Sequence, residues 1–440
     1  MTIPIVAVGE GSEELIGGLE RLHGPVTVVR RCAELAELLA ACQSGLARAA
    51  FIAEGSSELT ATLVDRLAAV GVAVLVLMDD VREAGRLRGI GAVVVGAQTD
   101  AAALAEQITD VVGARTGTRP GSIGPVLPEG GMQAAGMRTD AERTGPGGVA
   151  GSHQDGGTIL AVWGPAGAPG RTLVAVNIAA ELAASGKSVL LVDADTYGAS
   201  VASSLGLLDE SAGLAQACRL ADQGLLNVES LTKVATPVIF AGGQLRVLTG
   251  LTRPDRWPEL RKAALGMVLA RSREVADVTV IDCGFCLESD EALSYDTVAP
   301  QRNAATLGSL AAADLIFAVG SADAVGVPRL VRGLAELRAA VPGTTTKVVL
   351  NKMRTGAAGR GPERALKLAW ERFGPGSEID HFLPWDPSPA DRTMLAGQLL
   401  REAAAGSVLH RAISALVCAP VQRSRKSAVL SATARLRVSR

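Results

Sequence analysis

The stretch ILAVWGPAGAPGRT, residues 159–172, joins five apolar residues to a turn of Gly, Pro and Ala that ends in Gly170, Arg171 and Thr172. Residues 173–183 continue as an apolar helical pattern. Small residues leave backbone N–H groups free to surround an anion, and the N-terminus of the next helix directs them at it. A cation and a hydroxyl at the end of such a turn neutralise phosphate and bind Mg²⁺. The stretch therefore predicts a strand, a phosphate-binding loop and a helix.

Two further apolar runs end in carboxylates. Residues 188–192 lead into Asp193 and Asp195, and residues 278–281 lead into Asp282. The carboxyl ends of parallel strands meet at the edge of a sheet where α/β proteins bind ligands, so these side chains are expected beside the loop. A single aspartate at a strand end often caps a helix, and the interpretation therefore rests on the three together. Carboxylates there hold Mg²⁺ or orient water for phosphoryl transfer.

With these elements, residues 158–418 resemble the MinD/ParA group of P-loop ATPases, within the SIMIBI class. Residues 348–352, residues 383–387 and Asn177 add to the resemblance. The resemblance implies ATP and Mg²⁺ as cofactors. It places the Asp195 carboxylate in a first switch loop and makes Asp282 the Walker B carboxylate.

The resemblance also implies a set of site residues. The implied catalytic residues are Asp193, Asp195 and Asp282, and the implied metal ligands are Thr172, Asp193 and Asp282. Asn351 is expected to contact the adenine. The full cofactor-binding set is Gly164, Ala166, Gly167, Ala168, Pro169, Gly170, Arg171, Thr172, Leu173, Asn351, Pro384 and Asp386.

Two positions depart from the family pattern. The family's additional signature lysine, which reaches the nucleotide of a dimer partner, corresponds to Ala166. Arg171 stands where the family has its second lysine. A planar guanidinium does not replace a compact ammonium conservatively, although it keeps the charge. Weak or absent hydrolysis is therefore expected.

Residues 1–112 predict a separate α/β unit, with strands near 3–9, 26–30, 49–53, 72–78 and 92–95. In length and rhythm the unit resembles a response-regulator receiver, but it lacks the acid cluster and the lysine of a working receiver. We interpret it as a degenerate receiver used for docking. The predicted fold class is therefore α/β, with two doubly wound parallel-sheet domains.

The remaining segments are interpreted from their composition and from short motifs. Residues 113–157 are rich in Gly, Pro, Ser, Thr and charge, which predicts a flexible linker. Residues 419–440 are basic, and such a tail either contacts anionic lipid or nucleic acid weakly or is a disordered end. The pair Cys283 and Cys286 is interpreted as part of a loop, with thiol or metal chemistry between subunits as the alternative. No leader or membrane span is recognisable, so a cytoplasmic protein, polar or peripheral at the membrane, is expected.

A receiver-like unit joined to such an ATPase resembles the CpaE/TadZ group and septum-site-determining-like proteins. The resemblance implies an ATP-binding, nucleotide-switched homodimer that positions a pilus, secretion or division assembly, with protein partners from that machinery and weak hydrolysis. One alternative is a non-hydrolysing scaffold. Another is a ParA-type DNA-partitioning ATPase, against which the net charge of −2 counts.

Overall fold

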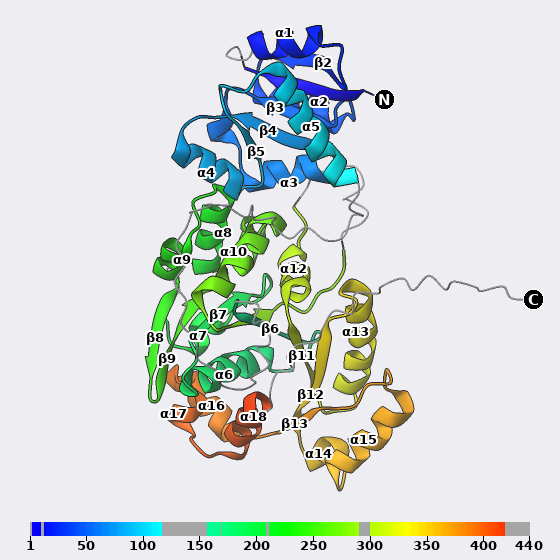
Figure 1. Ribbon diagram of the computed structural model, residues 1–440. Coiled ribbons are helices and arrows are strands. Elements are labelled where there is room, and N and C mark those ends of the chain that lie inside the picture. The colour runs from blue at the N-terminus through cyan, green and yellow to red at the C-terminus, as the bar shows by residue number, and fades with distance from the viewer. Residues whose placement is uncertain are drawn as a thin grey trace, which may run out of the picture.

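The chain folds into two α/β units, which Figure 1 shows one above the other. The computed structural model describes residues 2–9, 13–116, 156–167, 169–207, 211–289 and 300–418. Ala168, most of the predicted linker and the predicted basic tail lie outside the described residues. The α/β class and the predominantly parallel sheets predicted from the sequence are confirmed.

The N-terminal unit contains a five-stranded sheet in the order β2-β1-β3-β4-β5, and all neighbouring strands are parallel. Apolar residues of α2, α3 and α4 fill the core on one face, and those of α1 and α5 fill the core on the other. The strands are β1 (Ile3–Val8), β2 (Val26–Cys32), β3 (Ala49–Ile52), β4 (Ala73–Leu77) and β5 (Val93–Val95). The helices are α1 (Glu13–Arg21), α2 (Leu35–Gln43), α3 (Ala61–Ala69), α4 (Val81–Gly89) and α5 (Ala101–Thr116).

This strand order is the flavodoxin-like order of doubly wound folds. Each of the five strands expected from the sequence is present. Helix α5 continues to Thr116, beyond the domain boundary expected at residue 112. The interpretation as a degenerate receiver stays a prediction, because many unrelated functions share this order.

The second unit contains an eight-stranded sheet in the order β13-β12-β11-β6-β10-β7-β9-β8. Only the pair β8–β9 is antiparallel within this sheet. The strands are β6 (Thr158–Trp163), β7 (Val189–Ala194), β8 (Thr236–Phe240), β9 (Gly243–Leu248), β10 (Val278–Cys283), β11 (Leu315–Ser321), β12 (Thr345–Met353) and β13 (His381–Pro384). Strands β8 and β11 were not expected from the sequence, and β11 adds a strand directly beside β6.

Helices cover both faces of this sheet. Helix α6 (Arg171–Ala184) and α18 (Val408–Cys418) pack into one core with α17 (Leu400–Ala403). The other core takes α8 (Gly213–Asp222), α9 (Val228–Val234), α10 (Lys262–Val275), α12 (Ala304–Ala312), α13 (Gly326–Ala340) and α15 (Pro362–Phe373). Shorter or more peripheral helices are α7 (Val201–Ser204), α14 (Thr355–Ala358) and α16 (Pro387–Ala396). None of the described helices is both long enough and apolar enough to cross a membrane.

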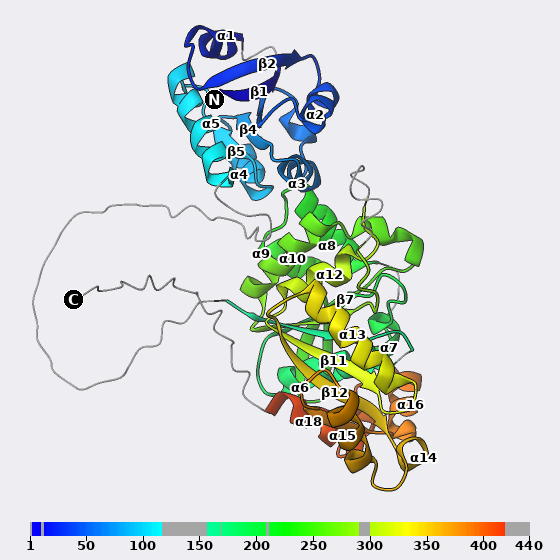
Figure 2. The ribbon, with the colours of Figure 1, turned by 90° about the vertical axis from the view of Figure 1, so that its right-hand side faces the viewer.

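The two units touch through α3 on one side and α8 and α10 on the other, as Figures 1 and 2 both show. The backbone N–H and the hydroxyl of Thr62 donate to Asp222 Oδ1 at 2.8 and 2.5 Å. Arg86 Nη1 donates to the carbonyl oxygen of Gln223 at 3.2 Å, and Met267 packs against the apolar core of the N-terminal unit. At the other end of α8, the N–H of Gly213, the first residue of the helix, donates to Thr249 Oγ1 at 2.9 Å.

We predict that Asp222→Ala weakens the docking of the two units by about 1–3 kcal/mol, because it removes the acceptor of both Thr62 hydrogen bonds. The cores of the units lack this side chain, so each unit should keep its own fold. Differential scanning calorimetry should show the N-terminal unit unfolding at a lower temperature, separately from the second unit. Glu229→Ala, an exposed change on α9, is the matched control. Identical calorimetric profiles for both variants would contradict the prediction.

Candidate phosphate-binding site

The loop predicted from residues 164–172 connects β6 to α6, and Gly170 is the residue before the helix. Gly167 and Gly170 have φ angles of +113° and +93°, a region that side chains with a Cβ rarely adopt. A Cβ on Gly170 would also lie 2.6 Å from Asn351 Nδ2. The loop conformation therefore requires glycine at both positions, as a close backbone approach to phosphate would.

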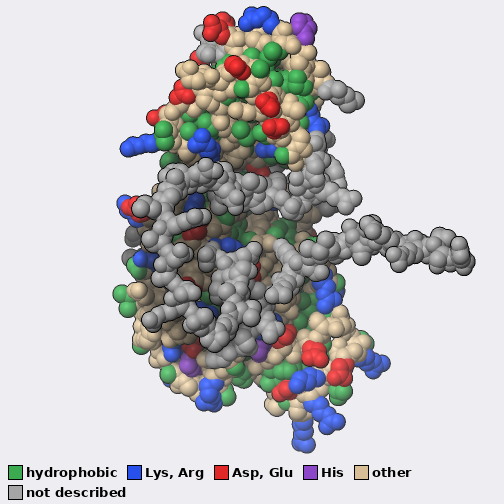
Figure 3. Space-filling view, in the orientation of Figure 1, with side chains coloured by type: hydrophobic (Ala, Val, Ile, Leu, Met, Phe, Trp, Pro, Cys, Tyr) green, Lys and Arg blue, Asp and Glu red, His purple; other side chains and the backbone are tan. Residues whose placement is uncertain are grey.

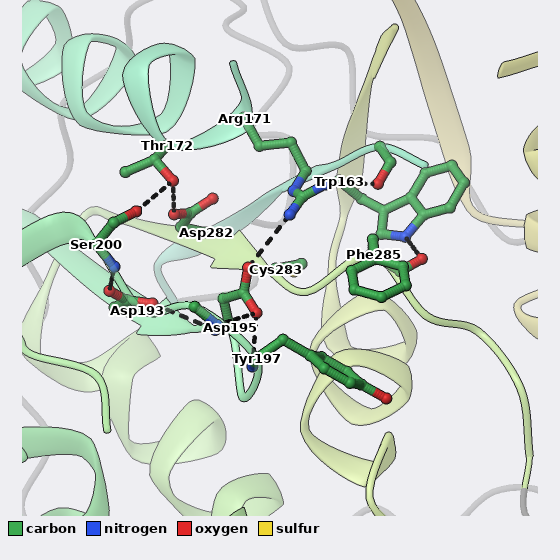
Figure 4. A network of polar contacts seen from close by, with 12 residues as sticks. Trp163, Arg171, Thr172, Asp193, Asp195, Tyr197, Ser200, Asp282, Cys283 and Phe285 are labelled. Carbon is green, nitrogen blue, oxygen red and sulfur yellow. Dashed lines mark hydrogen bonds and ion pairs between the residues drawn. The ribbon is translucent and has the colours of Figure 1, made fainter. Parts of the chain in front are cut away.

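The hydroxyl of Thr172 reaches the carboxylate predicted at the end of β10. Thr172 Oγ1 donates to Asp282 Oδ2 at 2.6 Å and lies 3.1 Å from Ser200 Oγ (Figure 4). Strand register explains the meeting, because β10 lies between β6 and β7 and aligns Asp282 with Val162 and with Asp193. The sequence correctly indicated that these strand ends lie together.

Arg171 points back across the loop (Figure 4). Its Nη1 donates to the carbonyl oxygens of Gly164 and Pro165 at 3.0 and 3.3 Å, and its Nη2 lies 3.2 Å from Asp195 Oδ2. The exposed fractions of the two side chains are only 13% and 9%, so this ion pair is shielded from water. Arg171 thus ties the entrance of the loop to the end of β7.

Asp193 and Asp195 organise the segment that follows β7. The Asp193 carboxylate accepts from the N–H groups of Ser200 and Val201, each at 2.9 Å, and of Asp195 at 3.2 Å. Asp195 Oδ1 accepts from the N–H groups of Tyr197 and Gly198 at 2.9 and 3.2 Å. The Asp193 carboxylate therefore accepts hydrogen bonds from the backbone N–H groups at the start of α7. Its role as a metal ligand stays a prediction.

Burial sets the acidity of two of the carboxyl groups. Asp193 is 1% exposed, and burial, opposed by its backbone hydrogen bonds, raises its pKa to about 7. Burial, together with the nearby Asp193 charge, raises the pKa of Asp282 well above its ordinary value. Among the described residues, Asp282 Oδ1 and Arg171 Nε are buried without a hydrogen-bond partner. Such an unpaired acceptor and donor fit a divalent cation and a phosphate respectively.

Asn351 is buried and contacts the loop. Its Nδ2 donates to the carbonyl oxygen of Pro169 at 2.7 Å, and its Oδ1 accepts from the N–H of Lys352 at 2.8 Å. The side chain thus supports the loop, and an adenine contact stays a prediction. Pro384 ends β13 on the far side of β12, and Asp386 follows two residues later, at the start of α16.

The other predicted residues divide between the loop and the core. Leu173 lies in the first turn of α6, and Ala166 and Gly167 lie on the loop facing α13. Asn177 is buried, where its Nδ2 donates to the carbonyl oxygen of Leu173 and its Oδ1 accepts from the N–H of Leu400. Asn177 therefore joins α6 to α17.

An aromatic cluster beside the site was not foreseen. Tyr197 and Phe285 follow the two strand ends, and their ring centroids lie 4.8 Å apart. Tyr197 Oη donates to Asn303 Oδ1 at 2.8 Å, and the Arg302 guanidinium lies 4.4 Å from the Tyr197 ring. Trp163 Nε1 donates to the carbonyl oxygen of Phe285 at 3.2 Å (Figure 4). The only sequence signal was position, two or three residues after Asp195 and Asp282.

The two cysteines of the Cys-x-x-Cys pair differ in environment. Cys283 is the buried last residue of β10, and Cys286 is partly exposed, with its Sγ 3.3 Å from Asn303 Nδ2. Within the described part of the chain, no group of three or more His, Cys, Asp or Glu residues is arranged to hold a metal ion. Cys286 follows the strand, as the loop interpretation expects, whereas Cys283 is the last residue of β10 and not part of a loop.

The parallel sheet, the loop that opens α6 and the Thr172–Asp282 hydrogen bond define a P-loop NTPase fold. Residues 157–261 match the ParA family model, described as NUBPL iron-transfer P-loop NTPase. This match supports a MinD/ParA-like P-loop ATPase and confirms the resemblance inferred from the sequence for that part of the chain. A search of curated proteins found no match.

Similar solved structures include two MinD proteins and one ParA family ATPase. The cell division ATPase MinD of Pyrococcus furiosus is 19% identical over 59% of this chain and 96% of its own, with a TM-score of 0.45. The septum site-determining protein MinD of Pyrococcus horikoshii OT3, complexed with Mg-ADP, is 17% identical over 59% and 93%, with a TM-score of 0.44. A ParA family ATPase of Chlorobium tepidum TLS is 16% identical over 60% and 99%, with a TM-score of 0.48.

The raised pKa of Asp282 predicts a pH-dependent stability. A carboxyl group whose pKa is raised by folding stabilises the fold fully below its unfolded pKa of about 4, and this contribution is lost as the pH rises through the folded pKa. We predict that Asp282→Asn, in the absence of nucleotide and Mg²⁺, has a free energy of unfolding about 1–3 kcal/mol above that of the unsubstituted protein at pH 8. The difference should shrink toward pH 4 to 5.

Urea unfolding at several pH values measures this difference. Asp277→Asn, just before the start of the same strand, is the matched control, because backbone donation from Ser188 lowers the pKa of Asp277. The Asp277 carboxylate stabilises the fold above its unfolded pKa, so its replacement should lower stability at pH 8. If both variants were less stable than the unsubstituted protein at pH 8, the ionised Asp282 carboxylate would not be destabilising the fold.

Proposed function

We propose that this protein binds Mg²⁺–ATP at the loop of residues 164–172 and acts as a nucleotide-switched dimer that positions a division, pilus or secretion assembly, with slow ATP hydrolysis. The observation that carries the proposal is the hydrogen bond from Thr172 to the buried Asp282, whose second carboxylate oxygen has no partner among the described residues. A hydroxyl and one carboxylate are the ligands that Mg²⁺ takes from proteins when phosphates and water complete its shell.

In this proposal, each residue of the site contributes to binding Mg²⁺–ATP. Backbone N–H groups of the loop and the first turn of α6 bind phosphate oxygens, while Thr172 and Asp282 hold the metal ion. The bound Mg²⁺ supplies positive charge that neutralises the phosphates. Arg171 binds phosphate with its planar guanidinium.

The Arg171–Asp195 ion pair gives a route from binding to a change of shape. Phosphate oxygens compete with Asp195 for the same guanidinium, so binding weakens the 3.2 Å contact and releases the segment that Asp195 holds. That segment contains Tyr197, which contacts Phe285 at the neighbouring strand end. Both strand ends therefore respond to one ligand, which is the behaviour of a switch.

Slow hydrolysis follows from the same contacts. The carboxylates of Asp193 and Asp195 each accept hydrogen bonds from at least two backbone N–H groups, and Asp195 also pairs with Arg171. Neither is free to orient an attacking water until the switch segment moves. A second candidate, the non-hydrolysing scaffold, is favoured by the buried Arg171–Asp195 pair if that pair persists with ATP bound.

DNA partitioning is a weaker candidate. On the face that Figure 3 shows, acidic and basic side chains are interspersed over α14 and α15, where Lys367 pairs with Glu363. Non-specific DNA binding depends on clustered cations that release counterions from the phosphate backbone. The mixed charge on this face does not provide such a cluster.

Calorimetry with Mg²⁺–ATP and Mg²⁺–ADP, and phosphate release from the same sample, test the proposal. Thr172→Val should weaken Mg²⁺-dependent ATP binding at least about tenfold, because the valine cannot bind the metal. Asp195→Ala should retain binding and lose turnover. Thr232→Val on α9, whose hydroxyl bonds only within its own helix, is the control and should bind as the unsubstituted protein does. No ATP binding by the unsubstituted protein would overturn the proposal, and binding without turnover would select the scaffold.

A further inference from the structure

A hollow of about 180 Å³ lies between the phosphate-binding loop and the start of α13. Pro165, Ala166, Gly167 and Pro169 line it on the loop side. The opposite side is formed by residues of the β11–α13 connection and the first turn of α13, namely Ser321, Asp323, Val325, Gly326 and Arg329. The loop thus presents a second surface, apart from the one that Arg171 and Thr172 occupy.

Arg329 is the cation of this hollow. Its Nη1 lies 2.6 Å from the position that a Cβ on Gly167 would take, so the guanidinium rests against the loop backbone itself. The side chain is exposed, and within the described residues it forms no hydrogen bond or ion pair. A guanidinium beside a phosphate-binding backbone has donors to spare for a ligand.

The acid in the hollow does not neutralise this cation. Asp323 accepts from Ser321 Oγ at 2.5 Å and from the N–H groups of Val325 and Gly326 at 3.0 and 2.7 Å. Its carboxylate is therefore engaged with the N-terminus of α13. The positive charge of Arg329 remains available at the mouth of the hollow.

Packing fixes Arg329 at the level of the loop. The next residue, Leu330, is fully buried, and α13 approaches the sheet closely at Gly333, where a Cβ would lie 2.9 Å from Trp163 Cη2. Trp163 is the last residue of β6, directly before the loop. The strand that leads into the loop thus also positions the helix that carries Arg329.

The balance of charge around the loop favours a second cation near a bound polyphosphate. Arg171 is the one charged residue among residues 164–172, and three aspartates, Asp193, Asp195 and Asp282, lie around Thr172. A polyphosphate carries several negative charges, and arginine binds phosphate through two parallel N–H groups. Arg329 is placed to supply that charge from outside the loop.

We propose that Arg329 is a second phosphate-binding residue of this site, contacting the nucleotide polyphosphate at the Gly167 edge of the loop. The inference rests on the proposed function, since it requires a nucleotide at this loop. It assigns to α13 a binding task that the loop sequence does not reveal.

The test compares Mg²⁺–ATP binding by the full chain and by Arg329→Ala, Arg329→Lys and Arg332→Ala. The Kd of Arg329→Ala should rise about tenfold or more, since a charge-assisted hydrogen bond is lost. Arg329→Lys should recover part of the affinity, because it keeps the charge and loses the fork. Arg332→Ala lies one turn farther along the same helix, outside the lining of the hollow, and its Kd should change less than twofold.

Two further readouts separate binding from folding. Thermal midpoints without nucleotide should agree among the four proteins, and the affinity of Arg329→Ala should fall less steeply with added salt than that of the unsubstituted protein. Equal affinities for Arg329→Ala and Arg332→Ala, with ATP still bound by the unsubstituted protein, would overturn the inference and leave the proposed function standing. Absence of ATP binding by the unsubstituted protein would remove both.

Discussion

The shielded ion pair of Arg171 and Asp195 joins the loop entrance, the first turn of α6 and the end of β7. Removing two charges from water is expensive, and a buried pair is rarely a net gain over apolar packing. Losing one partner is worse, because the other remains buried and uncompensated. The three elements are therefore held to one another by a contact that only another ionic partner, such as a phosphate, replaces at low cost.

The core of the site could be predicted because its signals are local. Small residues before Gly170-Arg171-Thr172, and apolar runs that end at Asp193 and Asp282, mark strand ends without knowledge of the tertiary structure. Parallel pairing of β6, β10 and β7 then brings Thr172 to Asp282, as expected. Burial of both strand-end carboxyl groups follows from the same central position in the sheet.

The rest depends on which elements become neighbours, and no local pattern states that. The contact of Asn351 with Pro169 exists because β11 and β12 extend the sheet beside β6, and β11 was not foreseen. The same strand positions α13, so Arg329 could not be connected with the loop from sequence spacing. Tyr197 and Phe285 meet only because two strand ends that lie far apart in the chain are adjacent in the sheet.

Helix α8 begins at a hydrogen bond to Thr249, one residue after the strand that pairs with β7, and ends at Asp222 against Thr62. Ten helical residues span about 15 Å, so a single rod runs from beside the Asp193 strand to the seam with the N-terminal unit. Helix α8 thus connects the two units through its contacts with Thr249 at one end and Thr62 at the other. Cleavage of the chain between residues 117 and 155 would leave these contacts in place.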